Sequence, residues 1–210
     1  MITLWHCVDA RSFRTLWALE ELQLPYELKT LPFPPRVHAA DFLAVNPLGT
    51  IPALRDADTF MSESAATVQY LVTRYGPSEL AVAVGDSAYG AWLNWLHFGE
   101  ATLTFPQTLV LRYSQLEPVE KRQPQVTEDY VRWFLSRARH VERALATDVY
   151  LCASRFTAAD ISVGYALLLA SVLKLDERLG PLTQAYWRRL RDRPAFVRAV
   201  AAQNGTLGRP

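Results

Sequence analysis

The segment NPLGTIPAL, residues 46–54, carries two prolines and a glycine directly before a short apolar run. Each proline fixes φ and the glycine accepts a positive φ, so this composition is typical of turns. The residue before a proline is biased toward extended geometry, which here applies to Asn46 and Ile51. We predict a turn entering a strand, with backbone groups beside Pro52 open for another chain to pair with. An ordinary loop that feeds a strand is the simpler interpretation of this segment alone.

A second motif lies just downstream, in the sequence FMSESAA at residues 60–66. It has the pattern of a strand that ends in a helix start, with Ser64 at the N-cap or within the first turn. A helix N-terminus has unpaired N–H groups and a positive dipole end, so it attracts a carboxylate or phosphate. Glu63 beside it is suited to accept hydrogen bonds from an ammonium group. The pair predicts a site for the zwitterionic end of an α-amino acid; a capping serine beside a solvated glutamate is the alternative.

Around these motifs, residues 1–76 predict a thioredoxin-like domain with the element order βαβαββα. Hydrophobic periodicity and turn residues support each element. A strand, a helix and a second strand in succession form a βαβ unit, so the first two strands should be parallel. The predicted strands cover residues 2–6, 26–31, 53–55 and 60–61, and the predicted helices cover residues 13–24, 37–45 and 64–75.

The rest of the chain predicts an all-helical domain, residues 88–210, after a linker at residues 77–87. One long helix is expected over residues 89–113, with a kink or division at Pro106, and a second over residues 126–146. Two further helices follow near the C-terminus, and the tail from Asn204 is expected to be loose. The fold class is therefore α/β followed by all-α.

The sequence RFTAADI at residues 155–161 contains a capping box in which Thr157 and Asp160 would bond each other's backbone N–H groups. Phe156 and Ile161 stand at the hydrophobic-staple positions on either side. The helix that follows, residues 158–173, is apolar on every face and should therefore be central. We assign this motif a structural role.

Composition excludes several classes of function. The 210 residues carry a net charge of +1 and no basic run, which gives no indication of nucleic-acid binding. The longest apolar stretch is too short to span a bilayer. Cys7 and Cys152 form no CxxC pattern, and the histidines show no metal-ligand spacing. We expect a cytoplasmic protein without metal, nucleic-acid partner or membrane span.

Together these motifs resemble the cytosolic glutathione transferase family over nearly the whole chain. The resemblance rests on residues 46–54, on Glu63-Ser64, on the run RSFRTLWALEEL at residues 11–22, and on the capping box. It implies a cis bond before Pro52 and backbone pairing of Ile51 with the cysteinyl unit of glutathione. It also implies that Glu63 and Ser64 hold the γ-glutamyl end. His38 is a candidate for the glycyl carboxylate.

The loop before the first helix, CVDARS at residues 7–12, departs from the family pattern. It is similar to the serine/cysteine type rather than the tyrosine type, yet the expected serine position falls near Asp9 or Ala10. Ser12 is the one hydroxyl in the loop, so it is a candidate either to stabilise the glutathione thiolate or to cap the helix. Arg11 is a second catalytic candidate, and a displaced or backbone donor is a third. Cys7 is a weaker candidate for a redox role.

The leading functional prediction is a glutathione transferase that joins the glutathione thiolate to a hydrophobic electrophile. The alternatives are a glutathione-dependent thiol-disulfide reductase or peroxidase, and a non-catalytic binding or interaction protein with the same fold. The electrophile pocket is expected between the loop at residues 7–11 and residues 105–113, with Leu109, Arg112 and Tyr113 as its lining. The resemblance also implies a homodimer, the commonest assembly among oligomers.

Overall fold

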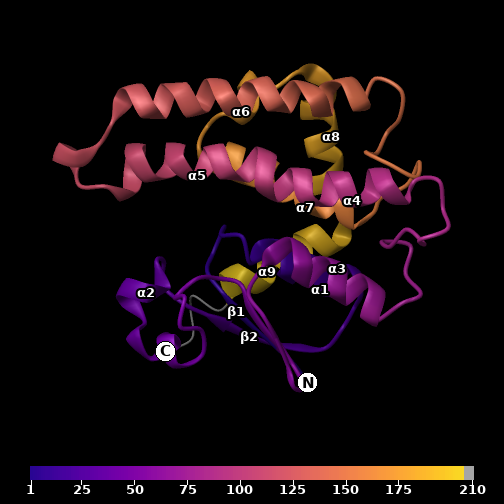
Figure 1. The fold of residues 1–210 in the computed structure, drawn as a ribbon, viewed down its shortest axis with the longest axis horizontal. Helices are drawn as coiled ribbons and strands as arrows, with labels where there is room; N and C mark the ends of the chain where they lie inside the picture. The colour runs from indigo at the N-terminus through magenta and orange to yellow at the C-terminus, as the bar shows by residue number, and fades with distance from the viewer. Residues whose placement is uncertain (206–210) are drawn as a thin grey trace. The chain divides into compact units, whose positions relative to one another are not determined.

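The computed structural model describes residues 1–205 and groups them into two compact units (Figure 1). The first unit contains Met1–Ala81 and the chain from Arg191 onward, and the second contains Val82–Leu190. The sequence predicts a helical domain over residues 88–210, whereas helix α9 (Pro194–Gly205) clusters with the first unit. Asn204 and Gly205, expected in a loose tail, belong to α9, and the rest of that tail lies outside the described residues.

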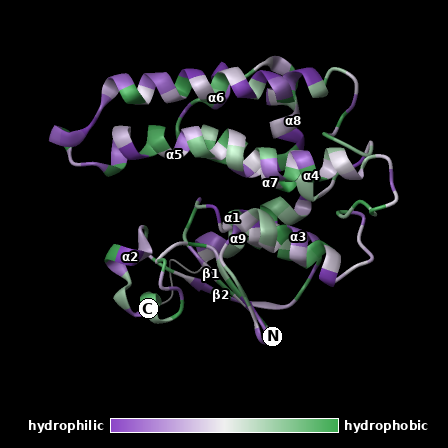
Figure 2. Ribbon diagram, viewed as in Figure 1, coloured by the Kyte–Doolittle hydropathy of each residue, from purple (hydrophilic) through white to green (hydrophobic). Residues whose placement is uncertain are grey.

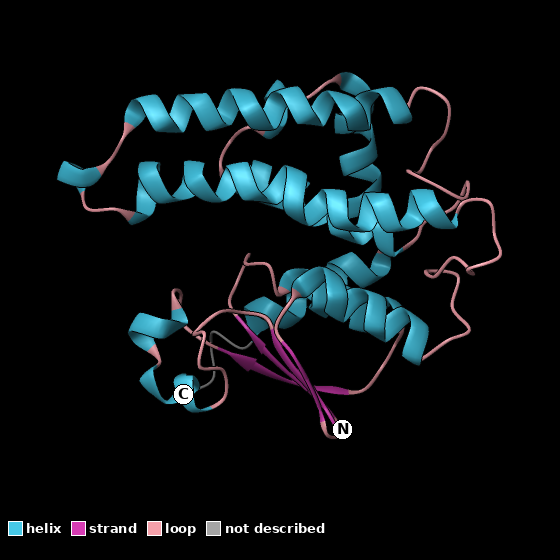
Figure 3. Ribbon diagram, viewed as in Figure 1, coloured by secondary structure: helices cyan, strands magenta, loops and turns pink. Residues whose placement is uncertain are grey.

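The first unit contains a four-stranded sheet in the order β2-β1-β3-β4 (Figure 3). Strand β1 pairs in parallel with β2 and antiparallel with β3, and β3 pairs antiparallel with β4. The predicted parallel pair, the predicted hairpin and the order βαβαββα are confirmed. The strands are β1 (Ile2–His6), β2 (Tyr26–Thr30), β3 (Ala53–Asp56) and β4 (Thr59–Met61), and the helices between and after them are α1 (Phe13–Glu21), α2 (Pro35–His38) and α3 (Ser64–Arg74).

Helix α1 is the centre of this unit, because it packs against both α3 and α9. Its residues from Phe13 through Leu19 are all buried. The rings of Phe13 and Trp17 meet the ring of Phe196 on α9 edge-on, with centroids 5.3 and 5.0 Å apart. Arg193 also donates two hydrogen bonds to the Glu21 carboxylate, at 2.7 and 2.9 Å. Aromatic burial and this bidentate ion pair explain why the last helix joins the first unit.

Two predicted helices end or break where the backbone leaves helical geometry. Helix α1 ends at Glu21 rather than residue 24, because Gln23 takes a left-handed conformation with φ 52°. The short helix predicted over residues 37–45 is instead α2 followed by a 3-10 turn, η1 (Ala40–Ala44). Ala39 separates them, with φ −142° and ψ 71°.

The second unit is helical throughout its regular elements. The helix expected over residues 89–113 is a continuous helical run that changes hydrogen-bond pattern, passing through α4, π-helix η2, α5 and π-helix η3. The first π segment ends just before Pro106, which lacks an N–H and crowds the preceding turn, and the second follows α5. The elements of the run are α4 (Tyr89–His97), η2 (Phe98–Thr104), α5 (Phe105–Leu111) and η3 (Arg112–Leu116), and the others of the unit are η4 (Val119–Lys121), α6 (Pro124–Ala144), α7 (Ala158–Val172), η5 (Asp176–Arg178) and α8 (Pro181–Arg191).

Helix α7 is central, as its uniformly apolar sequence predicts, and nearly all of its side chains are buried. Gly99 on η2 allows this packing, because a Cβ there would lie 2.6 Å from the Ser162 backbone. The Ser162 hydroxyl donates to the carbonyl oxygen of Leu96 at 2.6 Å. By contrast, hydrophilic and hydrophobic residues alternate along α6 (Figure 2), which matches a helix with one buried face.

The predicted capping box at the start of α7 is confirmed. The Thr157 N–H donates to Asp160 Oδ2 at 2.8 Å, and the Ala159 N–H donates to the Thr157 hydroxyl at 3.3 Å. The Tyr186 hydroxyl and the Leu151 N–H both donate to Asp160 Oδ1, at 2.7 and 3.2 Å. Asp160 therefore joins the helix start to two other segments of the second unit.

Among the described residues, no helix combines the length and the apolar character needed to cross a membrane. Within the same residues, no group of three or more histidine, cysteine, aspartate or glutamate side chains could hold a metal ion.

The burial of Asp160 predicts a pH-dependent stability. Burial raises the pKa of its carboxyl from 3.8 to about 6, and hydrogen bonds from Tyr186, Thr157 and Leu151 oppose the rise. The folded chain thus holds this proton to higher pH than the unfolded chain does. The stability that this provides is complete below pH 3.8 and is lost as the pH rises through about 6.

We therefore compare wild type with Asp160→Asn, which cannot ionise, by urea denaturation from about pH 3.5 to about pH 7. The wild-type free energy of unfolding should fall relative to that of the variant over this range. The variant also loses one acceptor oxygen, which lowers its stability by an amount that does not vary with pH. A constant difference between the two proteins would contradict the raised pKa.

Candidate functional site

The strand register places four chain segments at one edge of the sheet. His6, at the end of β1, pairs with Thr30 at the end of β2. Trp5 pairs with Ala53 at the start of β3, and Leu54 pairs with Met61 at the end of β4. The loop after β1, the segment after β2, the turn before β3 and the start of α3 therefore meet at this edge. All the residues predicted to bind glutathione belong to these segments.

The turn before β3 has the predicted geometry. The Ile51–Pro52 bond is cis, and Gly49 has φ 60°. The Asn46 side chain holds the turn closed, because its Nδ2 donates to the Thr50 carbonyl oxygen at 2.7 Å and its Oδ1 accepts from the Leu48 N–H at 3.2 Å. An extra Cβ on Gly49 would come within 2.6 Å of Arg36 Cβ, so both space and φ require glycine here.

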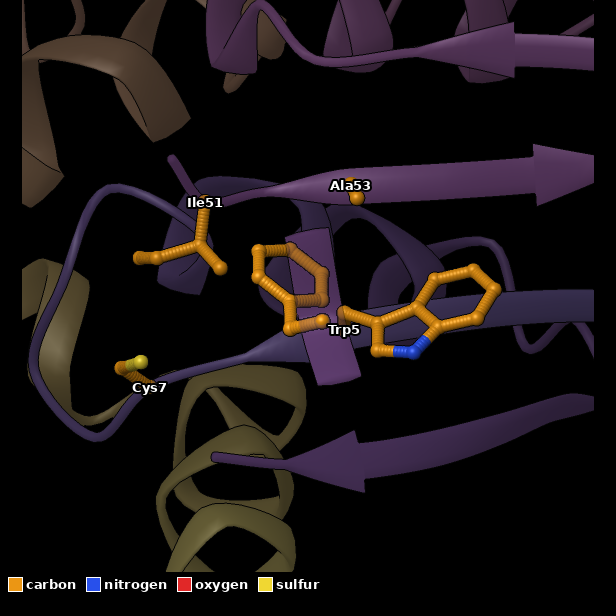
Figure 4. Packing of buried hydrophobic residues seen from close by; sticks show 5 residues of the cluster. Trp5, Cys7, Ile51 and Ala53 are labelled. Atoms are coloured by element: carbon orange, nitrogen blue, oxygen red, sulfur yellow. The ribbon is translucent and has the colours of Figure 1, made fainter. Parts of the chain in front are cut away.

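The Ile51 side chain anchors this turn to the sheet. It is 8% exposed and belongs to a buried cluster with Trp5, Cys7, Phe42 and Ala53. Figure 4 shows Ile51 and Cys7 near the same end of the strands, with Trp5 and Ala53 further along them. The cluster fixes the side chain of Ile51 and so sets the position of its backbone.

Glu63 and Ser64 lie at the start of α3 with different surroundings. Glu63 occupies the N-cap position and is exposed, while Ser64 is in the first turn and is buried. The Ser64 hydroxyl accepts a hydrogen bond from Arg14 Nη1 at 3.1 Å. Arg14 is itself fully buried on α1. The first turn of α3 thus combines a helix N-terminus with a buried positive charge, and both favour an anion.

Ser12 is fully buried and does not form the predicted side-chain cap of α1. Its hydroxyl lies 2.8 Å from His6 Nδ1, and it accepts a hydrogen bond from the Cys7 N–H at 3.2 Å. These contacts occupy the hydroxyl inside the protein and weigh against a direct contact with a ligand thiolate. Arg11, the other catalytic candidate, is half-buried in the same loop.

Cys7 is a buried thiol at the end of β1. Its Sγ lies 3.7 Å from the carbonyl oxygen of Pro32, and burial raises its pKa to about 12. A thiol nucleophile needs its deprotonated form, so this environment is unsuited to redox chemistry at neutral pH.

The remaining predicted residues lie on two different units. His38 is exposed at the end of α2 in the first unit. Leu109, Arg112 and Tyr113 belong to the second unit, where Leu109 and Tyr113 are half-buried. The Arg112 guanidinium lies 5.4 Å from the centre of the Tyr113 ring, and its Nε donates to Glu117 at 2.8 Å.

Sequence reasoning missed three residues of this edge. Arg14 lies in the run RSFRTLWALEEL, and nothing in that local pattern indicates that its side chain is buried against Ser64. His6 shows no metal-ligand spacing, and its sequence neighbours indicate no other role for it. Gln203 bonds Asp9, 194 positions away, so no short-range spacing could have paired them.

Comparison with known proteins identifies the family. The sequence model described as "Glutathione S-transferase, N-terminal domain" matches residues 10–74. Glutathione S-transferase 3 of Zea mays is 31% identical over 204 residues, which cover 90% of this chain and 88% of that protein. Glutathione S-transferase 3 of Schizosaccharomyces pombe is 27% identical over 221 residues, which cover 99% of this chain and 90% of that protein.

Solved structures agree with the sequence relatives. A glutathione transferase from Methylococcus capsulatus superposes with a TM-score of 0.87 at 25% identity, covering 97% of this chain and 99% of that chain. One from Phanerochaete chrysosporium, in complex with oxidized glutathione, gives a TM-score of 0.85 at 27% identity, covering 97% and 96%. From the sheet edge, the sequence relatives and these structures together, we conclude that the chain belongs to the glutathione S-transferase family.

Proposed function

We propose that this protein is a glutathione transferase that binds glutathione at the sheet edge described above. The observation that carries the proposal is the strand register, which gathers the Ile51–Pro52 turn, the Glu63–Ser64 helix start and the loop after β1. In the reaction, the glutathione thiol releases its proton to water and its sulfur forms a bond to an electrophilic carbon. The leaving group departs with its electron pair, or an epoxide ring opens and its oxygen takes up a proton from water.

Each part of glutathione has a candidate partner in the first unit. The γ-glutamyl ammonium is assigned to Glu63, and the adjacent carboxylate to the N–H groups of the first turn of α3, supported by Arg14. The cysteinyl backbone is assigned to the backbone of Ile51, because an extended peptide adds to an open strand edge in this way. His38 is the proposed partner of the glycyl carboxylate. Because the Ser64 hydroxyl accepts a hydrogen bond from Arg14, we assign Ser64 the role of positioning the Arg14 guanidinium.

The thiolate is assigned to Arg11 and the loop backbone rather than to a side-chain hydroxyl. A cation and a helix N-terminus both stabilise a nearby anion, and this lowers the pKa of a thiol. For the electrophile, we propose that Leu109 and Tyr113 supply apolar surface and that Arg112 supplies a polar group.

A second candidate is a glutathione-binding protein without turnover. The observation that favours it is that Asp9 and Ala10 stand where the family's serine is expected, and that the Ser12 hydroxyl bonds His6. Assays with aryl halides, epoxides, hydroperoxides and mixed disulfides separate the two proposals. Turnover of any of them supports catalysis, and uniform inactivity with intact glutathione binding supports the second candidate.

The role of Glu63 predicts a loss of affinity. Replacing Glu63 by Gln removes the charged partner of the γ-glutamyl ammonium, so glutathione should bind about ten- to one-hundred-fold more weakly. Isothermal titration calorimetry measures this directly. Glu79→Gln is the matched control, because Glu79 is an exposed carboxylate beyond the other end of α3. An equal loss in both variants, or no wild-type binding at millimolar glutathione, would count against the assignment.

The environment of Cys7 predicts a slow reaction with alkylating agents. Since burial raises its pKa to about 12, almost no thiolate exists at neutral pH. We expect iodoacetamide to leave Cys7 unmodified in the native protein and to modify it after denaturation, as seen by peptide mass spectrometry. Rapid modification of the native protein would return the thiol-disulfide reductase to consideration.

The homodimer is also a proposal, and exposed aromatic side chains on α5 and α6 support it. Phe105 and Trp133 are 49% and 46% exposed, and Trp133 stacks on Tyr130 with ring centres 5.5 Å apart. Large exposed aromatic groups favour association, because a second copy would remove them from water.

This surface predicts that Trp133→Glu dissociates the dimer. Light scattering should give twice the chain mass of 23.7 kDa for wild type and the single mass for the variant. Val84→Glu is the control, because it places the same charge on another exposed apolar residue of the second unit. A monomeric wild-type protein, or a dimer that survives Trp133→Glu, would contradict the proposed interface.

A further inference from the structure

Gln203 on α9 joins the last helix to the loop after β1 through both ends of its amide. Its Nε2 donates to Asp9 Oδ1 at 2.8 Å, and its Oε1 accepts from the Asp9 N–H at 3.2 Å. The same Oε1 lies 3.2 Å from His6 Nε2. Gln203 is 3% exposed and its contact with His6 is buried, while its contacts with Asp9 are partly buried.

These contacts fix the direction of a chain of hydrogen bonds. Because Asp9 Oδ1 is an acceptor, the amide nitrogen of Gln203 faces it, and the amide oxygen therefore faces His6. Burial lowers the pKa of His6 to about 4, so the ring is neutral near pH 7 and carries one proton. That proton belongs on Nε2, which donates to Gln203. His6 Nδ1 is then the acceptor for the Ser12 hydroxyl at 2.8 Å.

The loop at Asp9 has an uncommon backbone conformation. Asp9 has φ 55°, in the left-handed region that non-glycine residues adopt uncommonly, although aspartate adopts it more readily than most. Gln203 holds both the N–H and the carboxylate of this one residue. The Cys7 N–H donates to the Ser12 hydroxyl at 3.2 Å, so the far end of the loop is tied into the same chain of bonds.

We infer that Gln203 is a positioning residue of the thiolate site, which acts by holding Asp9 and His6 so that the loop of residues 7–12 keeps one conformation toward the glutathione sulfur. This inference rests on the proposed function, since it concerns how the proposed site is built. It assigns Ser12 to the support of the loop, and it gives the last helix of the chain a role in thiol activation. Gln203 itself does not touch the reacting atoms.

The test replaces Gln203 by Met, which has a similar volume but cannot make these hydrogen bonds. The readout is the pKa of the bound glutathione thiol, titrated through the ultraviolet absorbance of its thiolate. We expect this pKa to rise by about one unit, which leaves about tenfold less thiolate well below the pKa. The affinity for glutathione should change by less than about threefold, because Glu63 and Ile51 are untouched.

Two further variants separate positioning from general damage. Asn204→Ala removes an exposed amide one residue along the same helix and should titrate like wild type. Asp9→Gly removes the carboxylate that accepts from Gln203 Nε2, while the backbone N–H at position 9 remains and the left-handed φ stays accessible. It keeps the test valid if the Gln203 variant does not fold. If Gln203 acts through Asp9, the double variant should show no larger pKa change than either single variant.

A measurement without glutathione tests the same network. Nitrogen-15 NMR of the ligand-free protein reports which ring nitrogen of His6 carries the proton, and we expect Nε2. The Nδ1 tautomer in wild type would overturn the inference. So would an unchanged thiol pKa in Gln203→Met and Asp9→Gly, or an equal shift in Asn204→Ala. If wild type does not bind glutathione, the proposed function fails together with the role of Gln203; if it binds normally and the variants are unchanged, only that role fails.

Discussion

The two-sided pairing of β1 is the constraint on which the rest of the first unit depends. Because successive side chains of a strand point to opposite faces, the register decides which residues meet which partners. Trp5 and Cys7 share a cluster with Ile51, while His6 bonds residues that lead into α1 and extend from α9. A slip of one residue would exchange these faces and separate both the turn before β3 and the loop after β1 from their supports. The register of the sheet therefore determines which segments form the candidate site.

Much of this architecture could be predicted from local patterns. The proline-rich turn, the hairpin and the capping box at Thr157 each depend on neighbours within a few residues, and each was found where expected. The features that the sequence did not predict depend on contacts between distant residues. Helix α9 belongs with the first unit because Phe196 packs on Phe13 and Trp17. The spacing of apolar residues in α9 does not indicate which helix it packs against. The π segment before α5 likewise contains Gly99, which packs against Ser162 on α7, and it ends just before Pro106.

The candidate site likewise contains some residues that local sequence patterns predict and others that depend on distant contacts. The segment at residues 46–54 and the pair Glu63–Ser64 carry their signals in sequence, because turn and helix-start chemistry are local. The environment of Ser12 has no such local signal. Its sequence position suggests a helix cap or a thiolate donor, but its hydroxyl bonds His6, six positions away. Strand alternation places His6 on the helix-facing side of β1, but only the structure shows that Gln203 completes its bonding. The contact of buried Arg14 with the Ser64 hydroxyl likewise joins residues that are distant in sequence, so no local pattern indicates it.

The return of the C-terminal helix to the first unit has a consequence for biosynthesis. A ribosome produces residues 1–81 long before it produces Gln203, and domains ordinarily fold in the order in which they emerge. Here the early segment lacks Phe196 to cover Phe13 and Trp17, and it lacks the amide that secures Asp9. The sheet and its hairpin can form during translation, but the loop after β1 reaches its final conformation only after α9 has been synthesised and has packed against α1. A loop near Asp9 thus depends on a residue 194 positions later in the chain.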